Sequence, residues 1–355
     1  MKVGHSRTHT MNPFEGGRLE LMGFETCAGA SVFSAAVLDI DAEAETRRIV
    51  ESIRTSVLLN LRRRGAVVGL SGGVDSSVVA ALCVRALGAE RVLGLFMPEQ
   101  HSSDDSLRLG QALAARLGIA ALTEDISPAL EGAGCYRRQE EAIRSVVPEY
   151  GAGWKCKLVM PSILGEARLS ITRLTVQSPQ GETRTMRLTA QAYLQLVAAT
   201  NYKQRMRKMS EYYHADRLQY AVSGTPNRLE YDQGFFVKQG DGAADFKPIA
   251  HLYKTQVYQL ARHLGVPEEI CKRPPTTDTF SMEQTQEEFY FALPYERMDL
   301  CLYAHNHHVP TAEAAPVLQL TPSQVERVYK DITAKRRATR YLHSVAQLVA
   351  PVKEI

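Results

Sequence analysis

The sequence predicts an α/β protein with a mainly parallel sheet, and three observations support this prediction. Short apolar runs typical of buried strands alternate with longer segments whose apolar residues recur at helical spacing. A turn rich in glycine and serine joins the first such strand to the helix after it. The composition, 45% hydrophobic and 23% charged, is that of an ordinary globular chain. Because parallel strands need right-handed crossovers, we expect helices on both faces of the sheet.

The first half of the chain contains three strand–helix repeats. Helical periodicity begins behind Asp41, which is placed to cap a helix, and continues to Leu61. Strands are expected at 65–70, 91–98 and 120–126, the first two of them buried, and helices at 76–87 and 104–118. The alternation of short strands with amphipathic helices indicates a parallel sheet with right-handed crossovers.

The pattern then changes. Two alternating runs, 168–177 and 183–190, flank a Pro/Gly turn and predict a β-hairpin. Helical spacing returns at 192–216, a fourth buried strand is expected at 218–224, and a further helix ends at Gly265 and Pro267. We interpret residues 41–355 as a single domain with an insertion at about 130–190, preceded by an N-terminal leader at 1–40.

Charge and composition exclude several classes of function. A formal net charge of +3 is too small to indicate a nucleic-acid or membrane partner. No apolar run approaches the roughly 20 residues that span a bilayer. The N-terminus lacks a continuous apolar signal segment, so we expect a cytoplasmic protein. The six cysteines form no C-x-x-C pair and are expected to be reduced thiols.

The turn SGGVDS, from Ser71 to Ser76, is typical of an anion site. A strand followed by this turn and a helix places several backbone N–H groups and the positive end of the helix dipole in one concave loop. Gly72 and Gly73 allow close approach of a phosphate, and the serines offer hydroxyl donors. Asp75 would repel phosphate unless it binds a bridging divalent cation. A simple helix cap is the alternative, but no capping motif needs this many small residues.

This turn resembles the pyrophosphate loop of the N-type ATP pyrophosphatases (the PP-loop superfamily), whose fold is the three-layer α/β/α arrangement of the adenine nucleotide alpha hydrolase-like proteins. Further motifs occur in the order seen in NAD synthetases: NYKQRMRKM from Asn201, GTPNRLE from Gly224, GFFVKQGDGAADFKPI from Gly234, LYKTQV from Leu252 and LGVPEEICKRPPT from Leu264. The resemblance covers residues 43–128 and 192–344. It implies an ammonia-dependent NAD synthetase.

The resemblance also implies roles for individual residues. Asp241 and Lys254 are expected to be catalytic. The residues expected to bind ATP are Ser71, Gly72, Gly73, Asp75, Ser76, Ser77, Met97, Arg207, Thr225, Lys254 and Thr276. Those expected to bind the carboxylate substrate are Asn201, Arg205, Lys238, Asp241 and Asp245. Asp75 and Glu230 are expected to bind Mg²⁺. The segment Pro274 to Glu288 is expected to form a lid.

In such enzymes a carboxylate of deamido-NAD attacks ATP, and ammonia then converts the acyl-adenylate to the amide of NAD. Positioning and charge neutralisation dominate this chemistry, so no nucleophilic side chain is expected. About 65 residues precede the loop, which is too few for the glutaminase domain of glutamine-dependent relatives. We therefore expect free ammonia or a separate glutaminase donor. Members of this family are usually homodimers, which is also the expectation here.

Several departures from the family pattern leave alternatives open. The family's KYGDGGAD is KQGDGAAD here, and an aromatic-rich stretch replaces the usual acidic one beyond the lid. Two further departures concern the acyl acceptor. Pro226 follows the Gly-Thr pair where a small residue is usual, and the hairpin between Arg168 and Leu188 has no counterpart in short NAD synthetases. Both lie on the side of the acyl acceptor, so a PP-loop enzyme that amidates another carboxylate, or thiolates tRNA, is the alternative. A non-catalytic nucleotide-binding regulator would have lost Asp75 and Glu230, and both are present. The hairpin is interpreted as a surface decoration or dimer contact.

Overall fold

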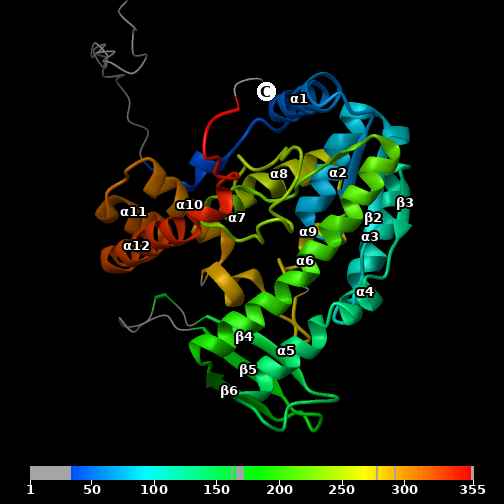
Figure 1. Ribbon diagram of the computed structural model, residues 1–355. Coiled ribbons are helices and arrows are strands. Elements are labelled where there is room, and N and C mark those ends of the chain that lie inside the picture. The colour runs from blue at the N-terminus through cyan, green and yellow to red at the C-terminus, as the bar shows by residue number, and fades with distance from the viewer. Residues whose placement is uncertain (1–32, 161–162, 165–171, 277–278, 292, 353–355) are drawn as a thin grey trace, which may run out of the picture. The chain divides into compact units, whose positions relative to one another are not determined.

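The computed structural model describes residues 33–160, 163–164, 172–276, 279–291 and 293–352 (Figure 1). Most of the expected leader, residues 1–32, therefore lies outside the described residues, as do residues 168–171 of the expected hairpin and 277–278 of the expected lid. The boundaries proposed for the leader and the insertion stay a prediction.

The central sheet has four parallel strands in the order β3-β2-β1-β7. These strands are β1 (Ala66–Gly69), β2 (Val92–Phe96), β3 (Ala120–Thr123) and β7 (Ala221–Val222). β1 and the edge strand β7 are separated by more than 150 residues of chain, yet Ala66 pairs directly with Ala221. The carboxyl ends of β1, β2 and β7 therefore meet at one edge, which is where open α/β sheets bind ligands.

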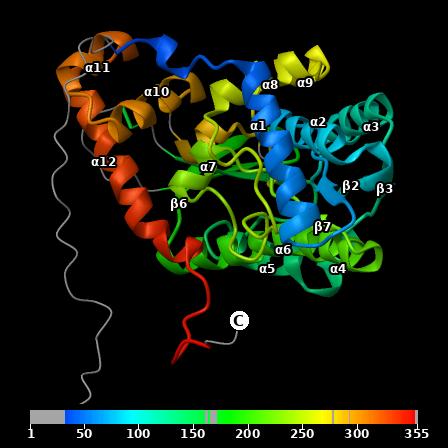
Figure 2. The ribbon, with the colours of Figure 1, turned by 90° about the horizontal axis from the view of Figure 1, so that it is seen from above.

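Helices cover both faces of this sheet, which confirms the expected three-layer α/β/α fold (Figures 1 and 2). Val68 points into a core shared with one helical layer, and its neighbour Val67 points into the opposite core. The first layer comprises α1 (Ala42–Arg54), α2 (Val74–Leu87), α3 (Asp104–Leu117), α8 (Lys254–Leu264) and α9 (Glu268–Lys272). The second comprises α4 (Ser127–Gly132), α5 (Cys135–Arg144) and α6 (Ala190–Leu218).

A second, antiparallel sheet packs beside α5 and α6, at the lower end of Figure 1. It consists of β4 (Lys155–Val159), β5 (Arg173–Gln177) and β6 (Thr183–Arg187), in that order. The β5–β6 pair confirms the expected hairpin, whereas β4 was not expected from the sequence. Leu158 and Leu174 pack on Ile143 and Leu196, so this sheet shares a core with the main body.

The C-terminal helices form a separate cluster, at the left of both views (Figures 1 and 2). It contains α10 (Tyr295–Asn306), α11 (Thr311–Leu318) and α12 (Pro322–Thr339), joined by α7 (Arg228–Gln233). A short π-helical turn, η4 (Glu287–Phe291), contributes Phe291 to the same core. Among the helices of the described residues, none is long and apolar enough to cross a membrane.

Candidate active site

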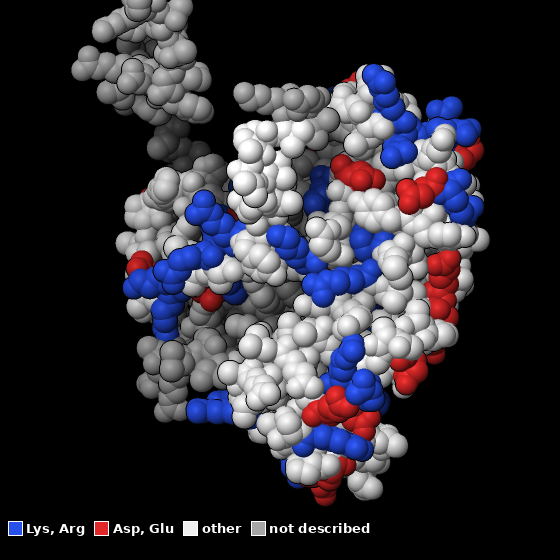
Figure 3. Space-filling model, viewed as in Figure 1, with Lys and Arg blue, Asp and Glu red and all other residues white. Residues whose placement is uncertain are grey.

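A cavity of about 510 Å³ opens at the carboxyl ends of β1, β2 and β7. Figure 3 shows the hollowed face, with Lys and Arg side chains across the middle of the view. Polar groups of the glycine–serine turn line one side of the cavity, and aromatic side chains such as Phe280, Phe289 and Tyr290 line another. A concave site with a few convergent polar groups and an apolar wall is typical of small-molecule binding.

The turn after β1 has the geometry of an anion-binding loop. Gly72 has a φ of 71°, and a Cβ added there would lie 2.4 Å from the carbonyl oxygen of Ser106, so only glycine fits. α2 begins directly after Gly73, which directs the N-terminus of the helix toward the cavity. The hydroxyl of Ser71 accepts from the N–H of Gly73 at 3.3 Å and contacts the hydroxyl of Ser76 at 3.2 Å.

Two carboxylates and a lysine meet at this loop. Lys254, the first residue of α8, forms an ion pair with Asp75. The side-chain amide of Asn227 donates to Asp75 Oδ1 and to Glu230 Oε2, both at 3.0 Å, and so holds the two carboxylates on one nitrogen. Gln286 donates to the other oxygen of Glu230 at 2.9 Å. Lys254 is only 2% exposed, so this cluster is largely screened from solvent.

Burial governs the protonation of this cluster. Burial and the neighbouring charge of Asp75 raise the pKa of Glu230 above its usual range. Burial acts to lower the pKa of Lys254, but the charges of Asp75 and Glu230 outweigh it, so the pKa of this lysine is raised. Two half-buried carboxylates thus face a single lysine, an arrangement that a bound cation would stabilise.

The expected ATP-binding residues lie around this cluster, with two exceptions. Ser71, Gly73, Asp75, Ser76, Met97, Arg207, Thr225, Lys254 and Thr276 all line the cavity. Arg207 donates to the carbonyl oxygen of Met97 at 3.3 Å, which fixes the loop after β2. Ser77 lies behind the turn, where its hydroxyl donates to the carbonyl oxygen of Gly73 at 2.8 Å. Gly72 does not line the cavity either, and shapes the turn through its backbone.

The residues expected to bind the carboxylate substrate divide into two groups. Asn201 and Asp241 line the cavity. Asp241 accepts from the N–H of Val237 at 2.7 Å, and burial raises its pKa. The other three lie outside the cavity lining. Arg205 and Lys238 are bonded to carbonyl oxygens, and Asp245 accepts from the N–H of Val222 at 2.7 Å.

Several cavity residues were missed by the sequence analysis. Lys208 and Glu211, three residues apart on α6, form a buried ion pair of 2.6 Å in the cavity wall. The signal that could have found them is the helical spacing of opposite charges. Asn227, outside the cavity lining, was also missed; it forms a capping box with the expected Glu230 at the start of α7, and the Asn-x-x-Glu pattern is visible in the sequence. Gln286 has no comparable signal.

The parallel sheet, the glycine–serine loop and the two carboxylates beside it define an α/β protein of the PP-loop class. A family model described as NAD synthase matches residues 45–146 and 168–340. The chain belongs to the NAD synthase family. Residues 147–167, which include β4, lie between the two matched segments.

Curated relatives agree with this assignment. The chain is 67% identical over 318 residues to the NH3-dependent NAD+ synthetase of Mesorhizobium japonicum, covering 90% of this chain and 100% of that protein. It is 59% identical over 324 residues to the protein of the same name from Rhizobium meliloti, covering 91% and 97%. Among solved structures, an NH3-dependent NAD synthetase from Campylobacter jejuni shares the fold, with a TM-score of 0.57 at 22% identity, over 88% of this chain and all of that one.

Proposed function

We propose that this chain is an ammonia-dependent NAD synthetase, which converts deamido-NAD to NAD with consumption of ATP. The observation that carries the proposal is the cluster of Asp75, Glu230 and Lys254 at the phosphate loop, in the same cavity as the half-buried Asp241. A phosphate-binding turn alone would suit many nucleotide-binding proteins. A buried lysine beside two carboxylates suits a reaction in which a carboxylate attacks a phosphate, because its positive charge stabilises the negative charge that develops there.

The reaction has two steps. A carboxylate oxygen of deamido-NAD attacks the α-phosphorus of ATP, the bond to the β-phosphate oxygen breaks, and pyrophosphate leaves. The nitrogen of ammonia then attacks the carbonyl carbon of the acyl-adenylate and loses a proton. The bond between this carbon and the phosphate oxygen breaks, and AMP leaves with the electron pair of that bond. We assign to the loop of Ser71, Gly73 and Ser76 the binding of the leaving pyrophosphate, and to Lys254 the neutralisation of charge on the phosphates.

The residues present fit a Mg²⁺ ion. Asp75 and Glu230 offer carboxylate oxygens, the ligands that Mg²⁺ prefers, and the amide of Asn227 holds the two carboxylates close together. Two carboxylates are sufficient because Mg²⁺ commonly completes its shell with substrate phosphates and water. When bound, the ion would neutralise phosphate charge in the site. Lys254 keeps Asp75 oriented toward the loop.

The remaining assignments follow from the family. We assign Met97, Arg207, Thr225 and Thr276 to ATP, and Asn201 and Asp241 to the reacting end of deamido-NAD. We assign Arg205, Lys238 and Asp245, which lie outside the cavity lining, to the more distant part of this long substrate. We further propose a homodimer. The five cysteines that the structure describes are free thiols, which supports a reducing compartment such as the cytoplasm.

The function is tested with the purified chain, ATP, Mg²⁺ and ammonium chloride. Deamido-NAD is expected to stimulate pyrophosphate release, with NAD and AMP formed in equal amounts. Nicotinate mononucleotide serves as the competing carboxylate, and Asp75→Asn as the variant with a damaged site. Pyrophosphate release that is unaffected by deamido-NAD, or greater with the mononucleotide, would contradict the assigned substrate.

A further inference from the structure

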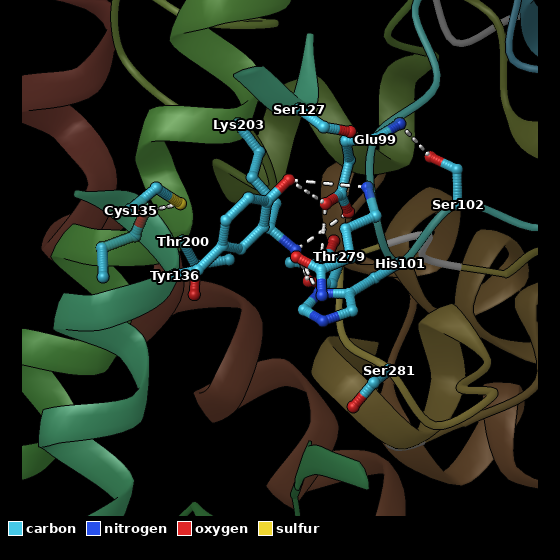
Figure 4. A network of polar contacts seen from close by, with 12 residues as sticks. Glu99, His101, Ser102, Ser127, Cys135, Tyr136, Thr200, Lys203, Thr279 and Ser281 are labelled. Carbon is cyan, nitrogen blue, oxygen red and sulfur yellow. Dashed lines mark hydrogen bonds and ion pairs between the residues drawn. The ribbon is translucent and has the colours of Figure 1, made fainter. Parts of the chain in front are cut away.

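A buried ion pair between Lys203 and Glu99 is the centre of a network of polar contacts (Figure 4). Lys203, on α6, is 1% exposed, and Glu99, in the loop after β2, is fully buried, with 2.9 Å between Lys203 Nζ and Glu99 Oε1. Neither residue belongs to the cavity lining. Their neighbours in the chain do: Thr200 and Gln204 beside Lys203, and Pro98 beside Glu99. The pair is therefore placed to act on the wall and not on a bound ligand.

The ammonium group of Lys203 has all three of its hydrogens satisfied. Besides Glu99, Nζ bonds to Nδ1 of His101 at 2.9 Å and donates to the carbonyl oxygen of Thr279 at 2.9 Å. Burial and the charge of Lys203 lower the pKa of His101 to about 4, so at neutral pH its ring is uncharged and Nδ1 is free to accept. The hydroxyl of Tyr136 donates to the second oxygen of Glu99 at 3.0 Å.

The hydrogen bond from Lys203 to the carbonyl oxygen of Thr279 reaches the expected lid. Thr279, Phe280 and Gln286 line the cavity, and Gln286 contacts Glu230 at the phosphate loop. Thr279 is the first described residue of this segment after Thr276. Lys203 thus binds the segment at the end that borders the loop after β2.

The second sheet binds the same segment further along. The N–H of Cys156 donates to the hydroxyl of Ser281 at 2.9 Å, and the N–H of Met282 donates back to the carbonyl oxygen of Cys156 at 3.1 Å. The N–H of Met160 donates to the carbonyl oxygen of Glu288 at 2.9 Å. β4 therefore serves as a platform for residues 281–288, and Lys203 fixes residue 279 ahead of it.

We propose that Lys203 is a positioning residue, which holds the segment 279–286 against the cavity so that the acyl-adenylate meets ammonia and not water. This inference rests on the proposed function. An activated acyl group is lost to hydrolysis if the site admits water, so a cover held by a buried charge serves the second step of the reaction. Lys203 suits this task because its three acceptors come from the loop after β2 and from the cover itself.

Two variants separate the tether from the ion pair. Glu99→Gln removes the negative partner but leaves Lys203 able to donate to the carbonyl oxygen of Thr279. Lys203→Met combined with Glu99→Gln removes the tether and leaves no unpaired charge, because both groups are replaced by neutral ones of similar size. Glu99→Gln leaves Lys203 buried without its carboxylate, so a merely structural role predicts at least as large a disturbance for this variant as for the double variant.

The first readout is the amount of AMP formed per NAD at a fixed ammonia concentration. We expect a ratio near unity for the unaltered chain and for Glu99→Gln. For the double variant we expect hydrolysis of the intermediate to rise about tenfold, since a buried hydrogen bond to a charged group is lost. The second readout is hydrogen exchange of the peptide spanning 279–291 without substrates, which is expected to be about tenfold faster in the double variant only.

The outcomes are distinct. Equal exchange in the two variants would overturn the tether, and faster exchange with an unchanged ratio of AMP to NAD would overturn its role in shielding the intermediate. Failure of the unaltered chain to form NAD would refute the proposed function instead, while the exchange measurement would still test the tether.

Discussion

Lys254 has the most demanding position of any side chain in the site. It is buried and charged, and its partner Asp75 is also bound by Asn227. A lysine in this environment is stable only while its carboxylate partners remain, and it delivers a full positive charge where water cannot screen it. The same charge that keeps Asp75 in place is therefore available to the phosphates of ATP.

Replacing Lys254 by methionine is expected to lower kcat/KM for adenylation by about 100- to 1,000-fold, because charge stabilisation in a buried site is lost. Pyrophosphate exchange into ATP in the presence of deamido-NAD measures this step directly. Lys335→Met is the matched control, since Lys335 is another buried lysine paired with an aspartate, Asp331, at 2.8 Å. The control variant should have a lower free energy of unfolding but should retain pyrophosphate exchange into ATP. Equal loss of exchange in both variants would show that folding, not charge, explains the effect.

Single residues also show which features of the site could be predicted from the sequence and which could not. Asp75, Glu230 and Lys254 were expected together because motifs in a fixed order carried them, and the structure places them together. Lys203 and Lys208 belong to a run of charged residues that reads as a solvated helix face, yet both are buried. The partner of Lys203 lies 104 residues away, and helical periodicity contains no information about such a partner.

At the scale of elements, helix α8 determines the position of Lys254 in the site. The helix begins at Lys254, and the N–H and hydroxyl of Thr255 both donate to Oδ2 of Asp299, at 2.7 and 2.8 Å. A carboxylate at a helix N-terminus is favoured by the helix dipole. Asp299 comes from α10, so the C-terminal cluster fixes the orientation of a helix that packs on the sheet.

Asp299 also makes stability depend on pH. Burial raises the pKa of Asp299 from 3.8 to about 7, against the hydrogen bonds from Thr255, which lower it. A folded pKa above the unfolded value means that the folded chain binds the proton more tightly. This contribution to stability is fully present below pH 3.8 and is lost as the pH rises through about 7. Over the whole pH range, this change in the free energy of unfolding is on the order of 4 kcal/mol.

The expected result for Asp299→Asn is a free energy of unfolding that falls less between pH 4 and pH 8 than that of the unaltered chain. Urea unfolding at a series of pH values measures the difference between the two. Asp41→Asn, which alters the exposed cap of α1, controls for loss of a capping charge without burial. Parallel curves for Asp299→Asn and the unaltered chain would contradict the assignment.

The elements themselves were predictable to different degrees. Strands β1 and β2 and helix α3 stand near their expected limits because apolar runs and turn residues mark them. β7 has only two residues, and it is a strand because β1 supplies its partners. β4 alternates over five residues between Lys155 and Val159, too short a pattern to distinguish from a loop without the strand β5 beside it.

At the scale of the whole molecule, the site is assembled from distant parts of the chain. The loop after β1, the capping box of α7, the start of α8 and the segment 279–286 all border one cavity. Asp75 and Glu230 are held by one amide although they are far apart in sequence. The cavity walls therefore form only when the sheet, the second sheet and the C-terminal cluster are all in place, so ligand binding should stabilise the molecule as a unit.

This coupling gives a test of the metal. A ligand present at one hundred times its Kd stabilises a folded chain by about 2.7 kcal/mol, and tighter binding stabilises it further. If Asp75 and Glu230 share a Mg²⁺ with ATP, ATP should raise the unfolding temperature more with Mg²⁺ than with a chelator. Glu230→Gln should reduce this difference, because one carboxylate is lost while its contact with Asn227 can persist. Glu268→Gln, on the exposed surface of α9, should behave as the unaltered chain does. An equal effect of ATP with and without Mg²⁺ in the unaltered chain would show that the two carboxylates serve another purpose, with Lys254 as the cation that compensates them.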